Sequence, residues 1–298
     1  MKELPLDRLR TILAAVDFSP CADAGLAHAI RLAQENGHGA QVVMLHAVQP
    51  LLYNRAWLDA EAESLVPTTS QLVDQAMSRM QATVAACAPS CAVRQEVVAG
   101  HALGTLLEWC DRLCPDLLVL GAHSTIDAFR HMGYVASGAI RKATAPVLAV
   151  HASSNRPFGR MLVATDFSET SLGALRHALR LAPKGGCDLE VIHAFPDPWA
   201  GVEPPDWHRA TVPDFVERYA NRVREQVREW ATPILAAKPE VRASFTAVQH
   251  PKPGQAIVER ARQGACDLIA IGTKGTTNLR YLLLGSTAER VLREVPCS

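Results

Sequence analysis

Short apolar runs alternate along this chain with longer segments in which apolar residues recur every three or four positions. Runs such as Thr11–Ala15 and Met161–Ala164 have the length of a strand and lack polar alternation, which is typical of a strand buried on both faces. The segment from Leu26 to Ala33 shows the helical spacing. Alternation of this kind predicts β-α-β units, a parallel sheet and helices on both of its faces.

The pattern occurs twice. Thr11–Ser19 and Met161–Ser168 both end in Asp-Phe-Ser, and the second strand of each half contains His-Ala, at His46 and His193. The further strands expected are Gln41–Val48, Val93–Ala99, Asp116–Leu120 and Ala145–His151 in the first half, and Asp188–Phe195, Val241–Gln249 and Asp267–Ile271 in the second. The later helices expected are Gln71–Ala86, Thr105–Leu113, Asp214–Ala237, Gln255–Gly264 and Ser286–Glu294. We therefore predict two tandem α/β domains, residues 1–152 and 153–298, each an open, Rossmann-like parallel-sheet sandwich.

The two halves differ at their ends. The first continues through a fifth apolar run, whereas the second stops at Val295-Pro296-Cys297-Ser298. We expect the final strand of the second domain to be missing.

Composition supports two cores and excludes several classes of protein. A length of 298 residues fits two domains at roughly 150 residues each. Hydrophobic residues make up 48% of the chain, and 30 basic residues balance 30 acidic ones, so no charge draws the protein to nucleic acid or membrane. The apolar runs are too short to span a bilayer, and the charged N-terminus has no signal core, so we expect a cytoplasmic protein. The eight cysteines form no Cys-x-x-Cys pair, and we expect them to be reduced.

A glycine pattern, Gly-x2-Gly-x9-Gly-Ser, follows the last strand of the second half. It consists of Gly272, Gly275 and Gly285-Ser286, with Thr287 next in the chain. Glycine lets backbone N–H groups approach a ligand closely, and a helix that begins after it offers free N–H donors at its positive end. The spacing is neither the Walker pattern nor Gly-x-Gly-x-x-Gly. These residues have the chemistry of a phosphate cradle, although a glycine-bearing structural loop is an equally open interpretation.

The Asp-Phe-Ser turns, the His-Ala pairs and this glycine pattern resemble the universal stress protein family, in its ATP-binding branch, over essentially the whole chain. The resemblance implies ATP, with Mg2+ as its companion, in the second domain. It implies that Asp166 contacts the nucleoside, although the same carboxylate could simply cap the helix that follows. The other contacts that it implies are the backbone around Thr165 and Val191, which flanks the adenine, and Gly272, Lys274, Gly275, Gly285, Ser286 and Thr287 at the phosphates and ribose. Lys274 is equally well explained as a solvated loop residue.

The first half departs from this pattern. Ser124 replaces the second glycine, and Gly133-Tyr134 replaces Gly-Ser after a spacer that is one residue shorter. A tyrosine at the cradle would crowd a phosphate. We therefore expect a degenerate first site, in spite of Asp17.

The resemblance implies a regulatory ATP-binding protein of the stress response, with a protein partner that the sequence does not identify. The repeat favours an intramolecular pseudo-dimer and leaves a further homodimer open. We find no catalytic group and no metal-ligand cluster in the sequence, so at most weak ATPase activity is expected. The alternative is a non-enzymatic scaffold or receptor for a non-nucleotide ligand or metal. Under that alternative Trp199, Trp207 and His208 line an apolar pocket, or else they pack as surface-loop aromatics.

Overall fold

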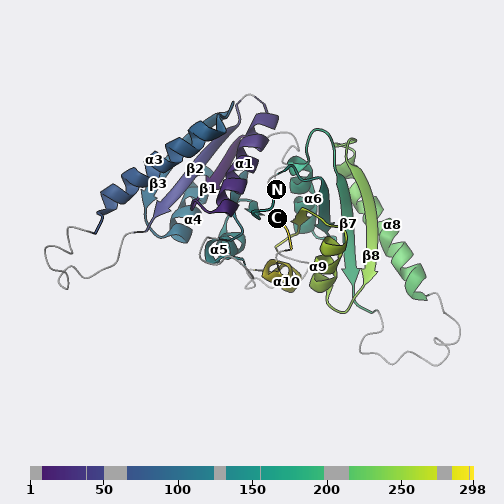
Figure 1. The fold of residues 1–298 in the computed structure, drawn as a ribbon. Coiled ribbons are helices and arrows are strands. Elements are labelled where there is room, and N and C mark those ends of the chain that lie inside the picture. Colours follow the sequence, from purple (N-terminus) through teal and green to yellow (C-terminus); the bar gives the residue numbers. More distant parts are fainter. Residues whose placement is uncertain are drawn as a thin grey trace, which may run out of the picture. The chain divides into compact units, whose positions relative to one another are not determined.

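The computed structural model describes residues 9–37, 39–49, 66–123, 132–154, 156–197, 215–273, 284–294 and 296–298. Within them the chain divides into two compact units, one in residues 8–129 and 133–155 and the other in residues 156–298, to which Met132 also belongs (Figure 1). The boundary between the units falls at residues 155 and 156, and the boundary expected from the sequence falls at residues 152 and 153. No helix in these described ranges is both long enough and apolar enough to cross a membrane.

The first unit is built on a five-stranded parallel sheet in the order β3-β2-β1-β4-β5. Its central strands are buried, as the continuous apolar runs predict. The strands are β1 (Thr11–Ala15), β2 (Gln41–Val48), β3 (Ala92–Ala99), β4 (Leu117–Gly121) and β5 (Val147–Val150). The helices are α1 (Pro20–Glu35), α3 (Thr69–Cys87), α4 (Ala102–Leu113) and α5 (Tyr134–Lys142).

The second unit repeats this plan with four strands, in the order β8-β7-β6-β9. The strands are β6 (Arg160–Ala164), β7 (Asp188–Phe195), β8 (Arg242–Gln249) and β9 (Leu268–Ala270). The helices are α6 (Glu169–Leu181), α8 (Phe215–Leu235), α9 (Pro253–Gln263) and α10 (Ser286–Glu294). Within the described residues this sheet has no fifth strand, but the Ile269 N–H donates to the carbonyl of Ser298 at 2.9 Å. The backbone of Ser298 therefore lies at the edge of β9 where the first unit has β5.

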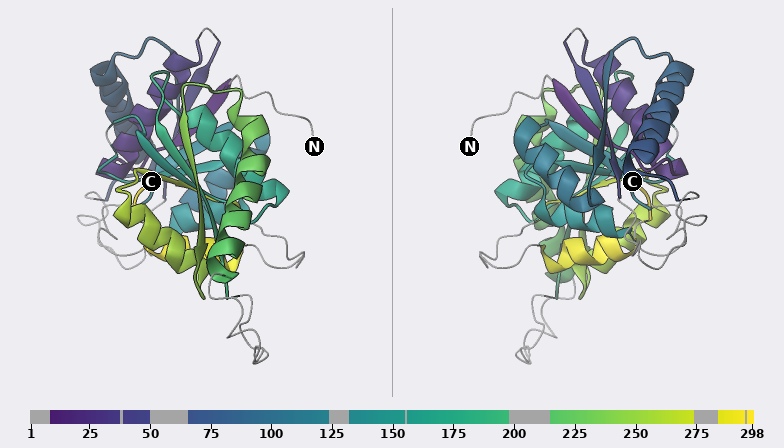
Figure 2. Two further views of the ribbon diagram at one scale, coloured as in Figure 1. Left: turned by 90° about the vertical axis from the view of Figure 1, so that its right-hand side faces the viewer. Right: turned by 90° about the vertical axis from the view of Figure 1, so that its left-hand side faces the viewer.

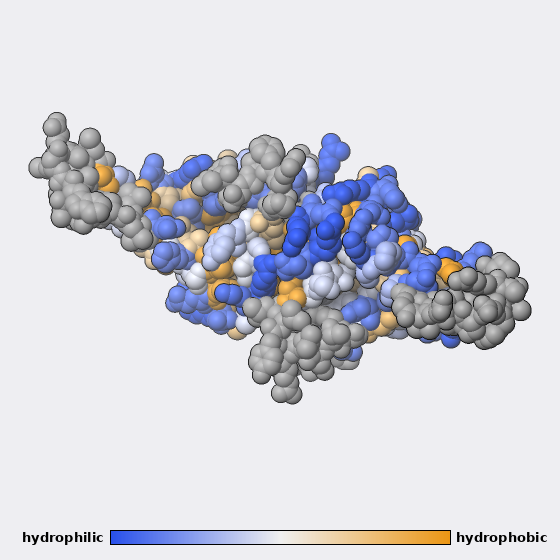
Figure 3. All heavy atoms as spheres, turned by 90° about the horizontal axis from the view of Figure 1, so that it is seen from below, coloured by the Kyte–Doolittle hydropathy of each residue, from blue (hydrophilic) through white to orange (hydrophobic). Residues whose placement is uncertain are grey.

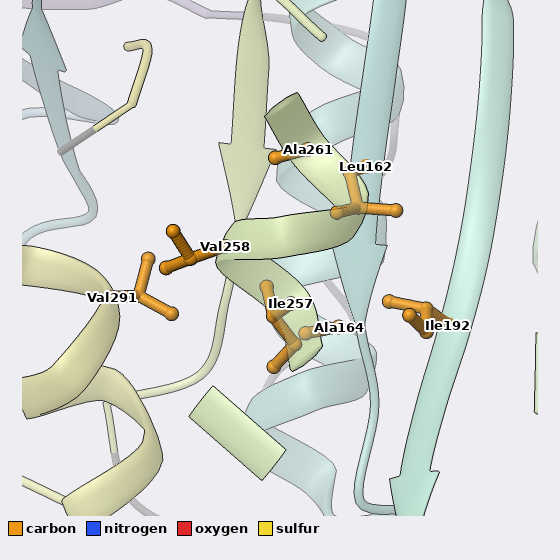
Figure 4. Close-up of a cluster of buried hydrophobic side chains, with 7 residues drawn as sticks. All are labelled: Leu162, Ala164, Ile192, Ile257, Val258, Ala261 and Val291. Carbon is orange, nitrogen blue, oxygen red and sulfur yellow. The ribbon is translucent and has the colours of Figure 1, made fainter. Parts of the chain in front are cut away.

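Strand order fixes which helices share a face in the second unit. α6 connects β6 to β7 and α8 connects β7 to β8, so both connections run in the same direction across the sheet. α9 connects β8 to β9 and runs in the opposite direction. Right-handed crossovers then put α6 and α8 on one face and α9 on the other, with α10 packed against α9. Figure 2 gives two further views of these layers. The core beneath α9 joins Leu162, Ala164 and Ile192 of the sheet to Ile257, Val258, Ala261 and Val291 of the helices (Figure 4).

Both first helices begin at the serine of Asp-Phe-Ser. Ser19 Oγ accepts a hydrogen bond from the Ala22 N–H at 3.1 Å, and Ser168 Oγ accepts one from the Ser171 N–H at 3.2 Å. Each serine satisfies one of the N–H groups that a helix start leaves unpaired. The repeated motif thus supplies the N-cap of the first helix in both units, and it fixes where the chain turns away from the sheet.

Candidate functional site

The candidate site of the second unit lies at the carboxyl ends of its strands. β6 lies between β7 and β9, and the chain leaves β6 toward α6 but leaves β9 toward α10, on the opposite face. Such a switch point opens a crevice beyond the strand ends in parallel α/β folds. Asp166 follows β6 and Gly272 follows β9, so the strand order brings the two neighbourhoods together, as the sequence predicted.

Asp166 holds the turn that follows β6. Its Oδ1 accepts hydrogen bonds from the Ser168 N–H at 3.1 Å and from the Ser168 hydroxyl at 2.5 Å. Burial raises the pKa of Asp166, but the hydrogen bonds from Ser168 and Ser171 together lower it more, so the net pKa lies below its usual value. The carboxyl group is therefore ionised at neutral pH. The carboxylate orients Ser168, the N-cap of α6. It also places a negatively charged hydrogen-bond acceptor at the carboxyl end of β6.

Phe167, the next residue, has a φ of 64°, a conformation that bulky side chains rarely adopt. Its ring lies 4.8 Å from the imidazole of His193, centroid to centroid. The first unit repeats this arrangement, since Phe18 has a φ of 60° and its ring lies 4.6 Å from His46. A strained backbone that recurs in both units needs such packing to hold it, and the ring of the histidine supplies it.

Thr165 has its polar atoms engaged inside the fold. Its Oγ1 lies 3.1 Å from Ser171 Oγ and accepts from the Phe167 N–H at 3.0 Å. Its N–H donates to the Ile192 carbonyl at 2.9 Å, and its own carbonyl accepts from Nδ1 of His193 at 2.7 Å. Thr165 therefore positions the Asp-Phe-Ser turn, and a contact between the backbone around it and an adenine stays a prediction.

Val191 lies in the interior of the sheet. It pairs with Val163 of β6 on one side and with Phe245 of β8 on the other, and its side chain is fully buried. A ligand beyond the strand ends does not reach this position. The side chain of Val191 thus belongs to the core, and a contact between the backbone around it and an adenine stays a prediction.

Ala194 of β7 lies beyond the last residue of the neighbouring strand β6. The carbonyl of Ile192 accepts from Thr165 on the β6 side, and the carbonyl of Phe195 accepts from the His250 N–H, at 2.8 Å, on the β8 side. Because the backbone groups of successive strand residues alternate in direction, the N–H and C=O of Ala194 face the β6 side. β6 has already ended there, at Ala164. The sequence analysis did not single out Ala194, although the His-Ala pair lies just before Phe195, the last residue of β7.

Gly272 has a packing reason to be glycine. A Cβ there would lie 3.0 Å from the Ser171 nitrogen and 3.0 Å from the carbonyl carbon of Thr170, in the first turn of α6. Gly121 in the first unit meets α1 in the same way, with Cys21 Cβ at 2.9 Å. This first glycine therefore lets the first helix approach the strand in both units. It does not distinguish a ligand site from a structural loop.

Gly285, near the end of the glycine pattern, is hydrogen-bonded to Thr273, which follows the first glycine of the pattern. Its N–H donates to the carbonyl of Thr273 at 2.9 Å, so the start of α10 lies beside the end of β9. α10 then begins at Ser286, which is exposed, while Thr287 is half-buried. Glycine has no side chain, so Gly285 itself cannot cap the first turn of α10 through a side-chain acceptor. Lys274 and Gly275 lie outside the described residues, as do Ser124, Trp199, Trp207 and His208.

The loop between β4 and α5 of the first unit is closed by a backbone hydrogen bond like that of Gly285, but the residue after the glycine differs. The Gly133 N–H donates to the Ala122 carbonyl at 2.9 Å, and Gly133 precedes α5 without a side-chain cap. Tyr134 stands where the second unit has Ser286, and 77% of its surface is exposed. The two units therefore share a backbone frame and differ in the side chain at the helix start.

Comparison with known proteins identifies the class of the chain and then its family. Two Rossmann-like units with the same turn and loop closure define a tandem α/β repeat protein. The model of the universal stress protein family matches residues 8–151 and again residues 157–298, so the chain belongs to this family. Universal stress protein Rv2623 of Mycobacterium tuberculosis is 26% identical over 291 residues, which cover 94% of this chain and 92% of that protein. Universal stress protein MJ0531 of Methanocaldococcus jannaschii is 28% identical over 145 residues, 47% of this chain and 79% of that protein.

Solved structures show the same fold over the full chain. A universal stress protein from Archaeoglobus fulgidus superposes with a TM-score of 0.64 at 18% identity, covering 97% of each chain. The functionally unknown protein PA1789 from Pseudomonas aeruginosa superposes with a TM-score of 0.60 at 17% identity, covering 97% of this chain and 90% of the other. The tandem arrangement of two parallel-sheet domains is thus shared with proteins of distant sequence.

Proposed function

We propose that the second unit binds ATP, with Mg2+, and that the protein acts as a nucleotide-responsive regulator in the stress response. The observation that carries the proposal is the hydrogen bond from Gly285 to Thr273. It sets the N-terminus of α10 beside the end of β9, at the same sheet edge as Asp166. Free N–H donors and the positive end of a helix dipole favour phosphate at such a place.

Each part of the nucleotide has a suitable group at this edge. The first-turn N–H groups and hydroxyls of Ser286 and Thr287 suit the phosphates, and the ionised Asp166 can accept from ribose hydroxyls. The N–H and C=O of Ala194 offer a donor and an acceptor to the edge of a base. Lys274 and Gly275 remain sequence-based proposals for further phosphate contacts.

Mg2+ fits the chemistry of this edge. The ion takes oxygen ligands from carboxylates, hydroxyls, phosphates and water, and Asp166 and Ser286 supply the first two kinds. Bound there, it would neutralise phosphate charge. The proposed role is binding, with at most weak hydrolysis.

The biological readout of ATP is part of the proposal. ATP occupancy would bias an interaction surface for a protein partner, or the pairing of the two units as a pseudo-dimer within one chain. We place the protein in the cytoplasm. A second candidate function, a scaffold or receptor for a non-nucleotide ligand, is favoured by Tyr134, because the first unit keeps the backbone frame but not the serine.

The test is calorimetric titration of ATP with Mg2+ into full-length protein stripped of nucleotide. We expect one site per chain, strongly weakened by Gly285→Val, which puts a branched side chain beside the phosphate donors. Tyr134→Ser, at the matching position of the first unit, is the control and should leave that affinity unchanged. Absence of binding at millimolar ATP would overturn the proposal and favour the scaffold.

A further inference from the structure

Gly254 brings α9 against the first turn of α10. It is the second residue of α9 and is buried, and a Cβ added to it would lie 2.7 Å from Arg290 Cβ and 2.9 Å from the carbonyl oxygen of Thr287. Real Cβ atoms essentially never approach other heavy atoms within 3.0 Å. Because one of the two atoms belongs to the backbone of α10, a side chain in place of the glycine would displace the helix itself. Gly254 therefore permits the close packing of α9 on α10.

The first unit has the same contact with the two residues exchanged. Leu103 is the second residue of α4, as Gly254 is of α9. Gly138 is the fifth residue of α5, as Arg290 is of α10. A Cβ added to Gly138 would lie 2.5 Å from Cδ2 of Leu103. Each contact accommodates a side chain from one helix, and the two units supply it from opposite helices.

We propose that Gly254 is a positioning residue for the phosphates of the nucleotide, an inference that rests on the proposed ATP site. The first turn of α10 offers Ser286 and Thr287 to the phosphates, and Thr287 is the residue whose carbonyl Gly254 meets. A helix pushed away from α9 would carry these donors with it and strain the hydrogen bond between Gly285 and Thr273. Groups that hold a ligand lose much of their effect when they are displaced by about 1 Å.

The far end of α10 is anchored to α9, so the displacement would be largest at the first turn. Val291 lies with Val258 of α9 in one buried cluster (Figure 4). Glu294, the last residue of α10, pairs with Arg262 of α9 at 3.0 Å and with Arg290 of its own helix at 2.7 Å. A side chain in place of the glycine acts on the end of α10 that lies farthest from these anchors. That end carries the proposed phosphate donors.

The exchanged pair of the first unit supplies a rescue for the test. Gly254→Leu gives α9 the residue that α4 has, and Arg290→Gly gives α10 the glycine that α5 has. Arg290 is exposed, and hydrophilic residues predominate where Figure 3 shows the second unit from the side of α9 and α10. Its replacement therefore removes little buried apolar surface. Arg290→Ala is the matched control, because it keeps the Cβ that the added side chain would meet.

The test is calorimetric titration of the full chain, stripped of nucleotide, with ATP and Mg2+ and separately with adenosine. We expect Gly254→Leu to weaken ATP binding by at least about tenfold and adenosine binding by less than about twofold, because adenosine has no phosphate for α10 to hold. Adding Arg290→Gly should restore the ATP affinity to within about threefold of the wild type, and adding Arg290→Ala should not. Gly173→Ala, where an added Cβ meets nothing within 4 Å, should change neither affinity.

Thermal melts show whether each variant folds, and Gly254→Ala replaces the leucine variant if that one does not. Its single added carbon meets the same atoms and should give a smaller loss with the same preference for ATP over adenosine. Unchanged ATP affinity in a Gly254 variant would overturn the positioning role and leave the ATP site standing. Equal losses for ATP and adenosine, or no recovery in the exchanged pair, would also overturn it. A wild type that binds no ATP would overturn the proposed function and this inference together.

Discussion

His193 donates its Nδ1 hydrogen to the backbone carbonyl of Thr165 across 2.7 Å, and so fastens the end of β7 to the end of β6. The same imidazole lies against Phe167, two residues further along the chain. His46 makes the equivalent bond to Val16 in the first unit, also at 2.7 Å. The His-Ala pair of each half is therefore a brace for the Asp-Phe-Ser turn, and the turn carries the aspartate of each crevice.

Replacement of His193 should separate the hydrogen bond from the ring packing. His193→Phe keeps an aromatic ring beside Phe167 but leaves the Thr165 carbonyl without its donor, which we expect to lower the free energy of unfolding by about 1–3 kcal/mol. His193→Ala loses the ring as well and should be less stable still. Urea denaturation measures both, with His101→Ala as the control. A phenylalanine variant as stable as the wild type would contradict the role of the bond.

Replacement of Gly272 by alanine should act mainly on stability. Its Cβ would meet the backbone of α6 at 3.0 Å, so we expect a loss of about 1–3 kcal/mol in the free energy of unfolding. The matched control is Gly173→Ala. Gly173 lies within α6 itself, and an added Cβ there meets nothing within 4 Å. It should be neutral or stabilise by up to about 1 kcal/mol. Full stability of Gly272→Ala with loss of ATP binding would instead show that a ligand is what requires this glycine.

The lowered pKa of Asp166 predicts a dependence of stability on pH. A carboxyl group whose pKa is lower in the folded than in the unfolded chain stabilises the fold above its unfolded pKa, about 3.9. That contribution is lost as the pH falls through the folded value. Asp166→Asn should therefore be less stable than the wild type near neutral pH, with a difference that shrinks on acidification. Thermal melts across this acid range measure it, and a constant difference would contradict the prediction.

The thiols should divide into fast and slow classes on alkylation. Burial, as the largest cause, raises the pKa of Cys110, Cys187 and Cys266 to about 11 and that of Cys297 to about 12. Each extra pKa unit cuts the reactive thiolate about tenfold at neutral pH. Cys87 and Cys114 are exposed, and iodoacetamide should label these two first. Mass spectrometry of timed samples identifies the order, and early labelling of Cys297 would contradict the raised pKa of its thiol.

Much of the fold could be predicted from the sequence because its signals are local. The strands Gln41–Val48 and Asp188–Phe195 have the predicted bounds. α4 begins at Ala102, three residues before the predicted start at Thr105. His101 precedes that helix without a side-chain capping bond, so the sequence carried no start signal there.

The site was predicted less completely, because hydrogen bonding directions and close approaches depend on partners far away in the chain. The sequence located Asp166 and Gly285, each next to a strand or helix end. It placed the β7 contact near Val191, and it could not show that the backbone N–H and C=O of Ala194 face the side where β6 has ended. It also could not show that Gly272 packs against α6.

The sequence by itself determined two α/β repeats with the same turns, because apolar periodicity and capping residues act over a few neighbouring positions. Only the tertiary structure decided which groups meet at the strand ends. His123 and His151 follow different strands, and their proximity arises because β4 and β5 pair in parallel register. Register fixes contacts between residues that no local pattern connects, and for that reason these contacts appear only in the folded chain.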